Sequence, residues 1–162
     1  MIVFKSISDY YSSDGLKRFD CGNNNLNEHL VKYAHQNEYR QISRTFLLLD
    51  DLTVIGYYTL ATADLDLDCF GLEEAKKLPN YPIPCIRIAR LAVDVNYQSK
   101  GYGKYLLKEI IKKVVSISSV VGIYAIIVDS KNEAVKFYEH FGFKSLETKE
   151  NTLALSVATL IK

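Results

Sequence analysis

The chain has few of the residues and patterns that mark several classes of protein. Its 162 residues include no tryptophan and only three cysteines. Cys21, Cys69 and Cys85 are widely spaced and form no CxxC pair, which argues against a disulfide framework or a zinc site and favours a reducing, cytoplasmic setting. No apolar run reaches the roughly 18 residues that a membrane-spanning helix requires. We therefore expect no membrane segment, and the N-terminal stretch indicates no signal peptide.

A strong excess of charge is also missing. The 20 basic and 19 acidic residues give a formal net charge of +1, which argues against a protein that coats nucleic acid through a strongly basic surface. Hydrophobic residues make up 48% of the chain, as in an ordinary globular domain. The length suits one domain, so we predict a single domain over residues 1–162.

Hydrophobic periodicity predicts a mixed α/β fold built on one sheet. The expected strands are 2–6, 45–49, 54–63, 85–95, 123–128 and 152–160. The expected helices are one capped by Asn23 or Asn24 that runs to about Gln36, a short one at 73–77, a strong one after Gly101, and one at 132–140. The turn at Asp50-Asp51 makes the second and third strands a hairpin.

The segment Arg90–Lys104 carries the first chemical signal. An apolar strand leads into a loop with two glycines, Gly101 and Gly103, and the loop opens an amphipathic helix. The first N–H groups of a helix lack internal partners, and the helix dipole favours negative charge beside them. Successive N–H donors and the lysines of this stretch could therefore hold a pyrophosphate.

Two common phosphate loops do not fit this segment. A Walker A loop needs glycine where Gln98 stands and Ser or Thr where Tyr105 stands, and a dinucleotide fingerprint needs glycine in place of Leu106. What remains, Gln-x-x-Gly-x-Gly after an apolar strand, resembles the acetyl-CoA pyrophosphate loop of GNAT N-acetyltransferases. The alternative is two glycines that merely open a helix. The cofactor-binding residues that the resemblance implies here are Gln98, Ser99, Lys100, Gly101, Tyr102, Gly103 and Lys104.

A second stretch, Asn132–Phe143, contains Asn, Ala, Phe-Tyr and Gly-Phe in the order of that family's second signature. The resemblance implies that Asn132 contacts the pantetheine arm and that Tyr138 places its hydroxyl near the thioester sulfur. A neutral phenol can donate a proton to a departing thiolate. For Phe137 and Phe141 we instead predict packing on an apolar helix face.

The resemblance also implies a role for the strand residues Leu91, Ala92 and Val93. The pantetheine amides would pair with this strand, and the N–H of Leu91 or Val93 would polarise the thioester carbonyl. The implied fold is a mixed, mostly antiparallel central sheet flanked by helices.

Further stretches are similar to one branch of the GNAT family. They are Phe19–Gly22, Ser43–Phe46, Gly56–Leu60, Leu78–Pro84 and Ile88–Val93. That branch includes bacterial toxins that acetylate the amino group of aminoacyl-tRNA and are neutralised by a ribbon-helix-helix antitoxin. The resemblance implies an enzyme that moves an acetyl group from acetyl-CoA to a primary amine. The alternatives are a small-molecule or protein amine as acceptor, or a CoA-binding module without activity.

Several questions stay open at this level. Five cations have two possible roles: they form a local RNA-binding patch, or they are ordinary surface cations and ion pairs. They are Lys32, Arg40, Arg44, Arg87 and Arg90. The apolar residues between 115 and 121 either form a homodimer interface or belong to the core. The candidates for a general base are Glu28, Asp64 and Glu73. The three histidines are scattered at positions 29, 35 and 140, so we predict no metal site.

Overall fold

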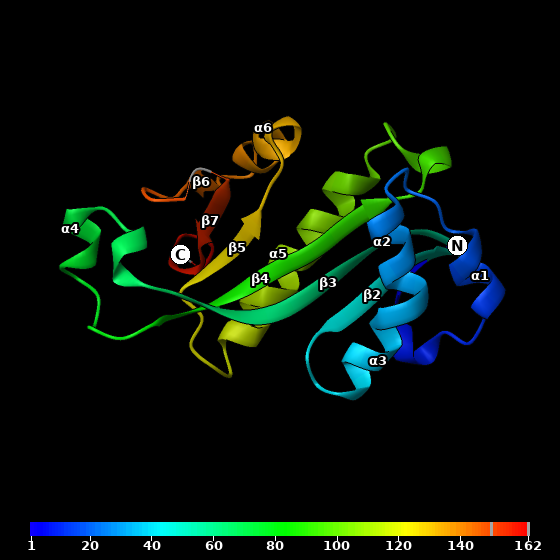
Figure 1. Cartoon of the computed structure of the whole chain (residues 1–162), viewed down its shortest axis with the longest axis horizontal. Coiled ribbons are helices and arrows are strands. Elements are labelled where there is room, and N and C mark those ends of the chain that lie inside the picture. The colour runs from blue at the N-terminus through cyan, green and yellow to red at the C-terminus, as the bar shows by residue number, and fades with distance from the viewer. Residues whose placement is uncertain (150, 162) are drawn as a thin grey trace. The chain divides into compact units, whose positions relative to one another are not determined.

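The computed structural model describes residues 1–149 and 151–161, and its strands form a seven-stranded sheet in the order β1-β2-β3-β4-β5-β7-β6 (Figure 1). The strands are β1 (Ile2–Ser6), β2 (Arg44–Asp50), β3 (Thr53–Leu65), β4 (Ile83–Val93), β5 (Ala125–Asp129), β6 (Lys144–Ser145) and β7 (Thr152–Ser156). β4 and β5 are parallel, whereas β1–β2, β2–β3, β5–β7 and β6–β7 are antiparallel. The predicted mixed, mostly antiparallel sheet is confirmed.

Short helices connect these strands, with one long exception. They are α1 (Ser13–Arg18), α2 (Asn24–Glu28), α3 (Ala34–Tyr39), α4 (Leu72–Ala75), α5 (Tyr102–Ser118) and α6 (Val135–Glu139). Within residues 1–149 and 151–161, no helix is long and apolar enough to cross a membrane.

The chain divides into two compact units, one formed by residues 1–61 and 89–110 and the other by residues 62–88 and 111–162. The single domain over residues 1–162 remains a prediction.

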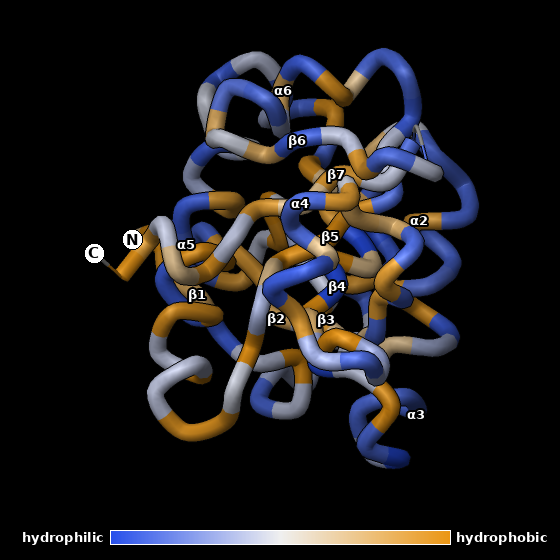
Figure 2. Tube along the Cα trace, turned by 90° about the vertical axis from the view of Figure 1, so that its left-hand side faces the viewer, coloured by the Kyte–Doolittle hydropathy of each residue, from blue (hydrophilic) through white to orange (hydrophobic). Residues whose placement is uncertain are grey.

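In the first unit, the meander of β1, β2 and β3 carries α2 and α3 (Figure 1). The Asn23 side chain accepts hydrogen bonds from the N–H groups of Asn25 and Leu26 and so caps α2, as predicted. Between α2 and α3 lies an unpredicted π-helical turn, His29–Tyr33. Leu30 and Ala34 are fully buried against the β2 and β3 side chains, whereas α3 presents mostly hydrophilic residues to solvent (Figure 2). Burial of this apolar face holds the helical segment on the sheet.

In the second unit, β5 is buried along Ala125–Val128 between β4 and β7. Its side chains pack with buried residues from the β3 end, the start of β4 and the segment around Phe70. Gly142 ends the α6 segment with a φ of 98°, a left-handed conformation that glycine adopts without strain. At the end of α5, Val120 is 88% exposed, so this part of the 115–121 stretch is surface and not core.

Two predicted strands extend beyond the ends of the observed strands. The strand expected at 85–95 ends at Val93, because the Asp94 side chain accepts from the Asn96 N–H and starts a 3-10 turn at Val95–Tyr97. The strand expected at 152–160 ends at Ser156 and continues as a 3-10 turn at Val157–Thr159. The apolar residues there alternate as in a strand, so periodicity alone extends the strand too far.

Candidate functional site

The loop before α5 is exposed, and its backbone turns through left-handed conformations. Ser99 has a φ of 62° and Gly101 a φ of 90°, and α5 begins at Tyr102. A Cβ at Gly101 would meet no heavy atom within 4 Å, so the backbone conformation and not lack of room calls for glycine there. Left-handed residues that alternate with helical ones turn successive N–H groups toward one point, which is a concave anion site. The start of the 17-residue helix α5 adds its dipole.

Tyr97 supports this loop and was not predicted. The Lys100 ammonium lies 5.7 Å from the centroid of the Tyr97 ring, and the Tyr102 ring meets Tyr97 edge to face at 5.9 Å. A cation over an aromatic face is restrained in direction but keeps its charge. An aromatic residue just before a Gly-x-Gly loop could have signalled this role.

Gln98 has a structural task in the first unit. Its side-chain amide donates hydrogen bonds to the carbonyl oxygens of Val93, at 2.8 Å, and Cys21, at 3.0 Å. Its amide nitrogen is therefore used by the protein, and the side chain ties the loop to the end of β4. If Gln98 contacts a cofactor, as predicted, the contact would be made by its backbone.

A buried carboxylate fixes the chain where β4 ends. Asp94 accepts from the N–H groups of Asp20, at 3.0 Å, and Asn96, at 2.9 Å, and the Val95 N–H donates to the Asp20 carbonyl oxygen at 2.8 Å. The Asp20 carboxylate in turn accepts from the Gly22 N–H, which together with the Asn27 amide lowers its pKa. The stretch Phe19–Gly22 thus holds the strand end in place.

The strand Leu91–Val93 follows the residues of β4 that pair with β5, which are Cys85–Ile88. On the side of β3, a Cβ at Gly56 would stand only 2.7 Å from the Ala92 carbonyl oxygen. Glycine at this position therefore lets β3 approach the backbone of this strand closely. Ala92 is buried in the core, while Leu91 and Val93 are half-buried.

Tyr138 lies on α6 in the second unit, enclosed by aromatic rings. Phe137 and Phe143 contact it edge to face at 5.1 and 5.5 Å between centroids. Its side chain is 7% exposed, and burial raises the pKa of its phenol to about 12. None of the described residues hydrogen-bonds its hydroxyl, which is therefore free to serve a bound molecule. At neutral pH this group is a protonated donor.

The other residues of the second signature lie as follows. Asn132 is exposed in a 3-10 turn before α6, where its carbonyl oxygen accepts from the Val135 N–H. Phe137 and Phe141 pack on each other at 5.8 Å, which supports the packing role predicted for them. His140 is exposed at the end of α6.

The five predicted cations have different surroundings. Lys32 pairs with Glu28 at 3.2 Å, Arg44 donates to Gln41 at 2.7 Å, and Arg87 is paired with Asp129. Arg40 is exposed after α3. The ion pairs of Lys32 and Arg87 leave these two cations little charge to spare, whereas Arg44 is bound to a neutral amide and keeps its charge.

Arg90 differs from the other four because it is half-buried and has no anionic partner among the described residues. It lies in the first unit, and no hydrogen bond or ion pair links its side chain to another of residues 1–149 or 151–161. Its charge lies near His29, a 2% exposed imidazole with an unpartnered Nε2 that stacks on Tyr57 at 6.4 Å. Burial, and then the charge of Arg90, lower the pKa of His29 to about 4. A half-buried guanidinium beside a neutral imidazole lacks an anion, which a ligand can supply.

The candidates for a general base are solvent-exposed carboxylates. Glu28 pairs with Lys32, Glu73 lies 3.5 Å from Lys76, and Asp64 is exposed on β3. Among the residues that the structure describes, no group of three His, Cys, Asp or Glu side chains could hold a metal ion.

Comparison with known proteins gives a consistent result. Residues 11–154 match the family model described as an acetyltransferase (GNAT) domain. A tRNA-acetylating toxin of Mycobacterium tuberculosis is 34% identical over 142 residues, which are 86% of this chain and 82% of the toxin.

Two solved structures are similar over nearly the whole chain. AtaT complexed with acetyl-methionyl-tRNAfMet superposes with a TM-score of 0.90 at 28% identity and covers 99% of this chain and 97% of that one. A mutant AtaT toxin bound to the C-terminus of the antitoxin AtaR and acetyl-CoA gives a TM-score of 0.78 at 26% identity, over 99% and 96% of the two chains.

Proposed function

The chain belongs to the GNAT family of acetyltransferases, and we propose that it transfers the acetyl group of acetyl-CoA to the amino group of an aminoacyl-tRNA. The similarity to a tRNA-acetylating toxin and to AtaT supports this acceptor. The observation that carries it in this chain is the half-buried Arg90, which has no anionic partner among the described residues.

Acetyl-CoA would be held through its pyrophosphate by the loop Ser99–Lys104. The left-handed backbone at Ser99 and Gly101, the N-terminus of α5 and the positive charge of Lys100 and Lys104 all favour a dianionic group. Gln98 contributes by fixing the loop to the end of β4. The strand Leu91–Val93 would pair with the pantetheine amides, and Asn132 would contact the same arm.

The reaction requires a direct attack of the amine on the thioester carbonyl. A C–N bond forms and a tetrahedral oxyanion develops, which an N–H of Leu91 or Val93 would stabilise. The C–S bond then breaks, the amine loses a proton to solvent, and the phenol of Tyr138 protonates the thiolate and is itself reprotonated from solvent. The raised pKa of Tyr138 keeps the phenol protonated until the thiolate forms. The amino group of an aminoacyl ester has a low pKa and needs little help from a base, which fits the absence of a buried carboxylate in the candidates above.

Arg90 distinguishes between acceptor classes. It directly precedes Leu91 in the strand proposed to hold the acetyl group. An unpaired guanidinium there attracts the phosphates of an RNA 3′ end and repels a polycationic small amine. A neutral or cationic acceptor would gain nothing from this residue.

Kinetics of Arg90 variants test the acceptor. We expect Arg90→Gln to raise the KM for aminoacyl-tRNA about tenfold, the loss of one charge-assisted phosphate contact, and to leave the KM for acetyl-CoA unchanged. Arg90→Lys should recover part of the loss and keep the salt dependence. Lys32→Gln is the matched control, because Lys32 is already paired with Glu28. An unchanged KM for aminoacyl-tRNA in Arg90→Gln would refute the assignment.

The proposal extends to partner and location. The AtaT neighbour bound to the C-terminus of its antitoxin supports an antitoxin as the partner of this chain. A charged tRNA as substrate would be met in the cytoplasm. Co-expression with the reading frame next to its gene, followed by co-purification, tests the partner.

A further inference from the structure

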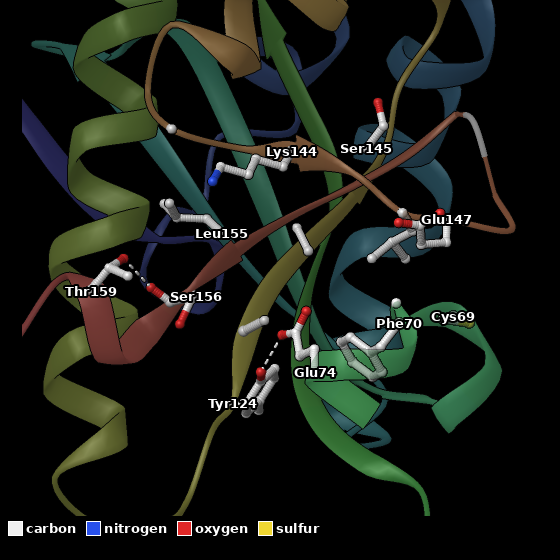
Figure 3. A pocket seen from close by; sticks show the side chains of 15 residues that line it. Cys69, Phe70, Glu74, Tyr124, Lys144, Ser145, Glu147, Leu155, Ser156 and Thr159 are labelled. Carbon is white, nitrogen blue, oxygen red and sulfur yellow. Dashed lines mark hydrogen bonds between the residues drawn. The ribbon is translucent and has the colours of Figure 1, made fainter. Parts of the chain in front are cut away.

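A cavity of about 360 Å³ opens within the second unit, and none of the residues proposed above lines it (Figure 3). It is bordered by the segment from Cys69 to Glu74, by Tyr124 at the start of β5, by β6 and the residues after it, and by the end of β7. Neither Tyr138 nor Asn132 lines it. Its volume lies within the range of about 300–1,000 Å³ that is typical of small-molecule sites.

The walls of the cavity combine apolar and aromatic surface. Phe70 is 8% exposed and meets the Tyr124 ring edge to face, with centroids 5.6 Å apart. Ala125 and Leu155 are buried beside them. A methylene chain could lie on this surface, and the faces of the two rings attract cations.

Two exposed carboxylates border the cavity and belong to different segments. Glu74 accepts a hydrogen bond from the Tyr124 hydroxyl through Oε1 (Figure 3), while its Oε2 has no partner within the described part of the chain. Burial and this contact with Glu74 raise the pKa of Tyr124 to about 12, so the phenol remains a neutral donor. Glu147 lies against Gly71, where a Cβ would stand 3.4 Å from its Oε1.

Negative charge at this cavity is not neutralised from within. No ion pair to Glu74 or Glu147 is formed by residues 1–149 or 151–161. Lys144 borders the cavity, but Figure 3 shows its ammonium turned away from both carboxylates. The remaining hydroxyls are uncharged, and that of Thr159 already donates to the Ser156 carbonyl oxygen.

We propose that this cavity binds an aliphatic diammonium ion, with one ammonium group at Glu74, the other at Glu147, and the methylene chain between them on Phe70 (Figure 3). Two separated carboxylates repel anions and suit a ligand with two cationic ends. A bound metal ion is a poor fit, because the described residues place no three acidic, His or Cys ligands together. An added peptide strand is also a poor fit, because the neighbouring edge strand β6 has only two residues.

Calorimetric titration of the purified protein with putrescine, in the absence of acetyl-CoA, tests the site. We expect saturable binding that weakens with salt, and a Kd raised about tenfold or more by Glu74→Gln and by Glu147→Gln, since each removes one charge-assisted contact. Glu73→Gln is the matched control, because Glu73 is adjacent in sequence, exposed, and does not line the cavity. Thermal unfolding of each variant verifies that it is folded.

Three results would overturn the proposal. They are no binding of putrescine to the unmodified chain, an equal loss of affinity in Glu73→Gln, and equally tight binding of butylamine, which has a single ammonium group. Binding is measured without acetyl transfer, so any of these results would leave the proposed acetylation of aminoacyl-tRNA untouched.

Discussion

The loop Ser99–Lys104 is exposed and offers a ligand its backbone N–H groups, whereas Tyr138 is buried among aromatic rings and offers a single hydroxyl. The loop depends on the left-handed conformations of Ser99 and Gly101, and the side chain that fixes it, Gln98, binds protein carbonyls. Tyr138 depends on one oxygen atom held in an apolar environment. Binding at the loop should therefore be sensitive to substitutions that disturb its backbone φ angles. The rate that depends on Tyr138 should be sensitive to the loss of its hydroxyl oxygen alone.

The largest effect is expected from removing that atom. Tyr138→Phe should lower kcat about 100- to 10,000-fold, because the departing thiolate loses its proton donor. The Kd for acetyl-CoA should stay the same, since the pyrophosphate loop is unaltered. Single-turnover acetyl transfer and a separate binding titration measure the two quantities.

Tyr81→Phe provides the control for that comparison, because Tyr81 is exposed and belongs to neither motif. If Tyr138→Phe retained full kcat, or lost acetyl-CoA binding instead, the hydroxyl would not be the proton donor.

An intermediate effect is expected from the backbone of the loop. Gly101→Ala places a side chain at a φ of 90° and should raise the KM for acetyl-CoA about tenfold, because the strained loop no longer presents its N–H groups together. Its kcat at saturating acetyl-CoA should change little.

Gly142→Ala is the matched control, since Gly142 has a φ of 98° but belongs to the second unit and not to the loop. It should lose stability without any change in the KM for acetyl-CoA. Equal KM values for Gly101→Ala and the unmodified chain would show that the loop does not bind the cofactor through its backbone.

The smallest effect concerns stability and pH. The pKa of His29 is lowered to about 4 in the folded protein, so the unfolded chain binds more protons than the folded one between about pH 4 and 6.5. The contribution of neutral His29 to the free energy of unfolding is fully present above pH 6.5 and is lost as the pH falls toward 4. Urea unfolding at several pH values measures this loss. The free energy of unfolding should fall less between pH 6.5 and 4 for His29→Gln than for the unmodified chain, and should fall as usual for the exposed control His35→Gln. The same fall in all three proteins would contradict the lowered pKa of His29.

The sequence predicted the sheet and the two motif segments because both rest on local patterns. The apolar run of β5, the Asn23 cap and the glycine loop before α5 each act within a few residues. The predictions for the strands that end at Val93 and Ser156 ran past those residues. Asp94, which follows Val93, is fixed by the Asp20 N–H, 74 positions away, and no local pattern shows this contact.

The side-chain roles at the site were harder to predict. The hydrogen bonds of Gln98 to Val93 and Cys21, and the lack of a partner for Arg90, depend on segments brought together only by folding. The same is true of the cavity between Glu74 and Glu147, which no motif marks. Local patterns indicate where backbone chemistry lies, whereas long-range contacts decide which side chains remain free.

Transfer of labelled acetyl groups to aminoacyl-tRNA tests the proposed acceptor. The purified chain is incubated with radiolabelled acetyl-CoA and a panel of charged tRNAs, beside uncharged tRNA and small primary amines. The account predicts label on the amino group of at least one aminoacyl-tRNA, none on uncharged tRNA, and loss of the signal with Tyr138→Phe. Label on a small amine with none on any aminoacyl-tRNA would contradict it.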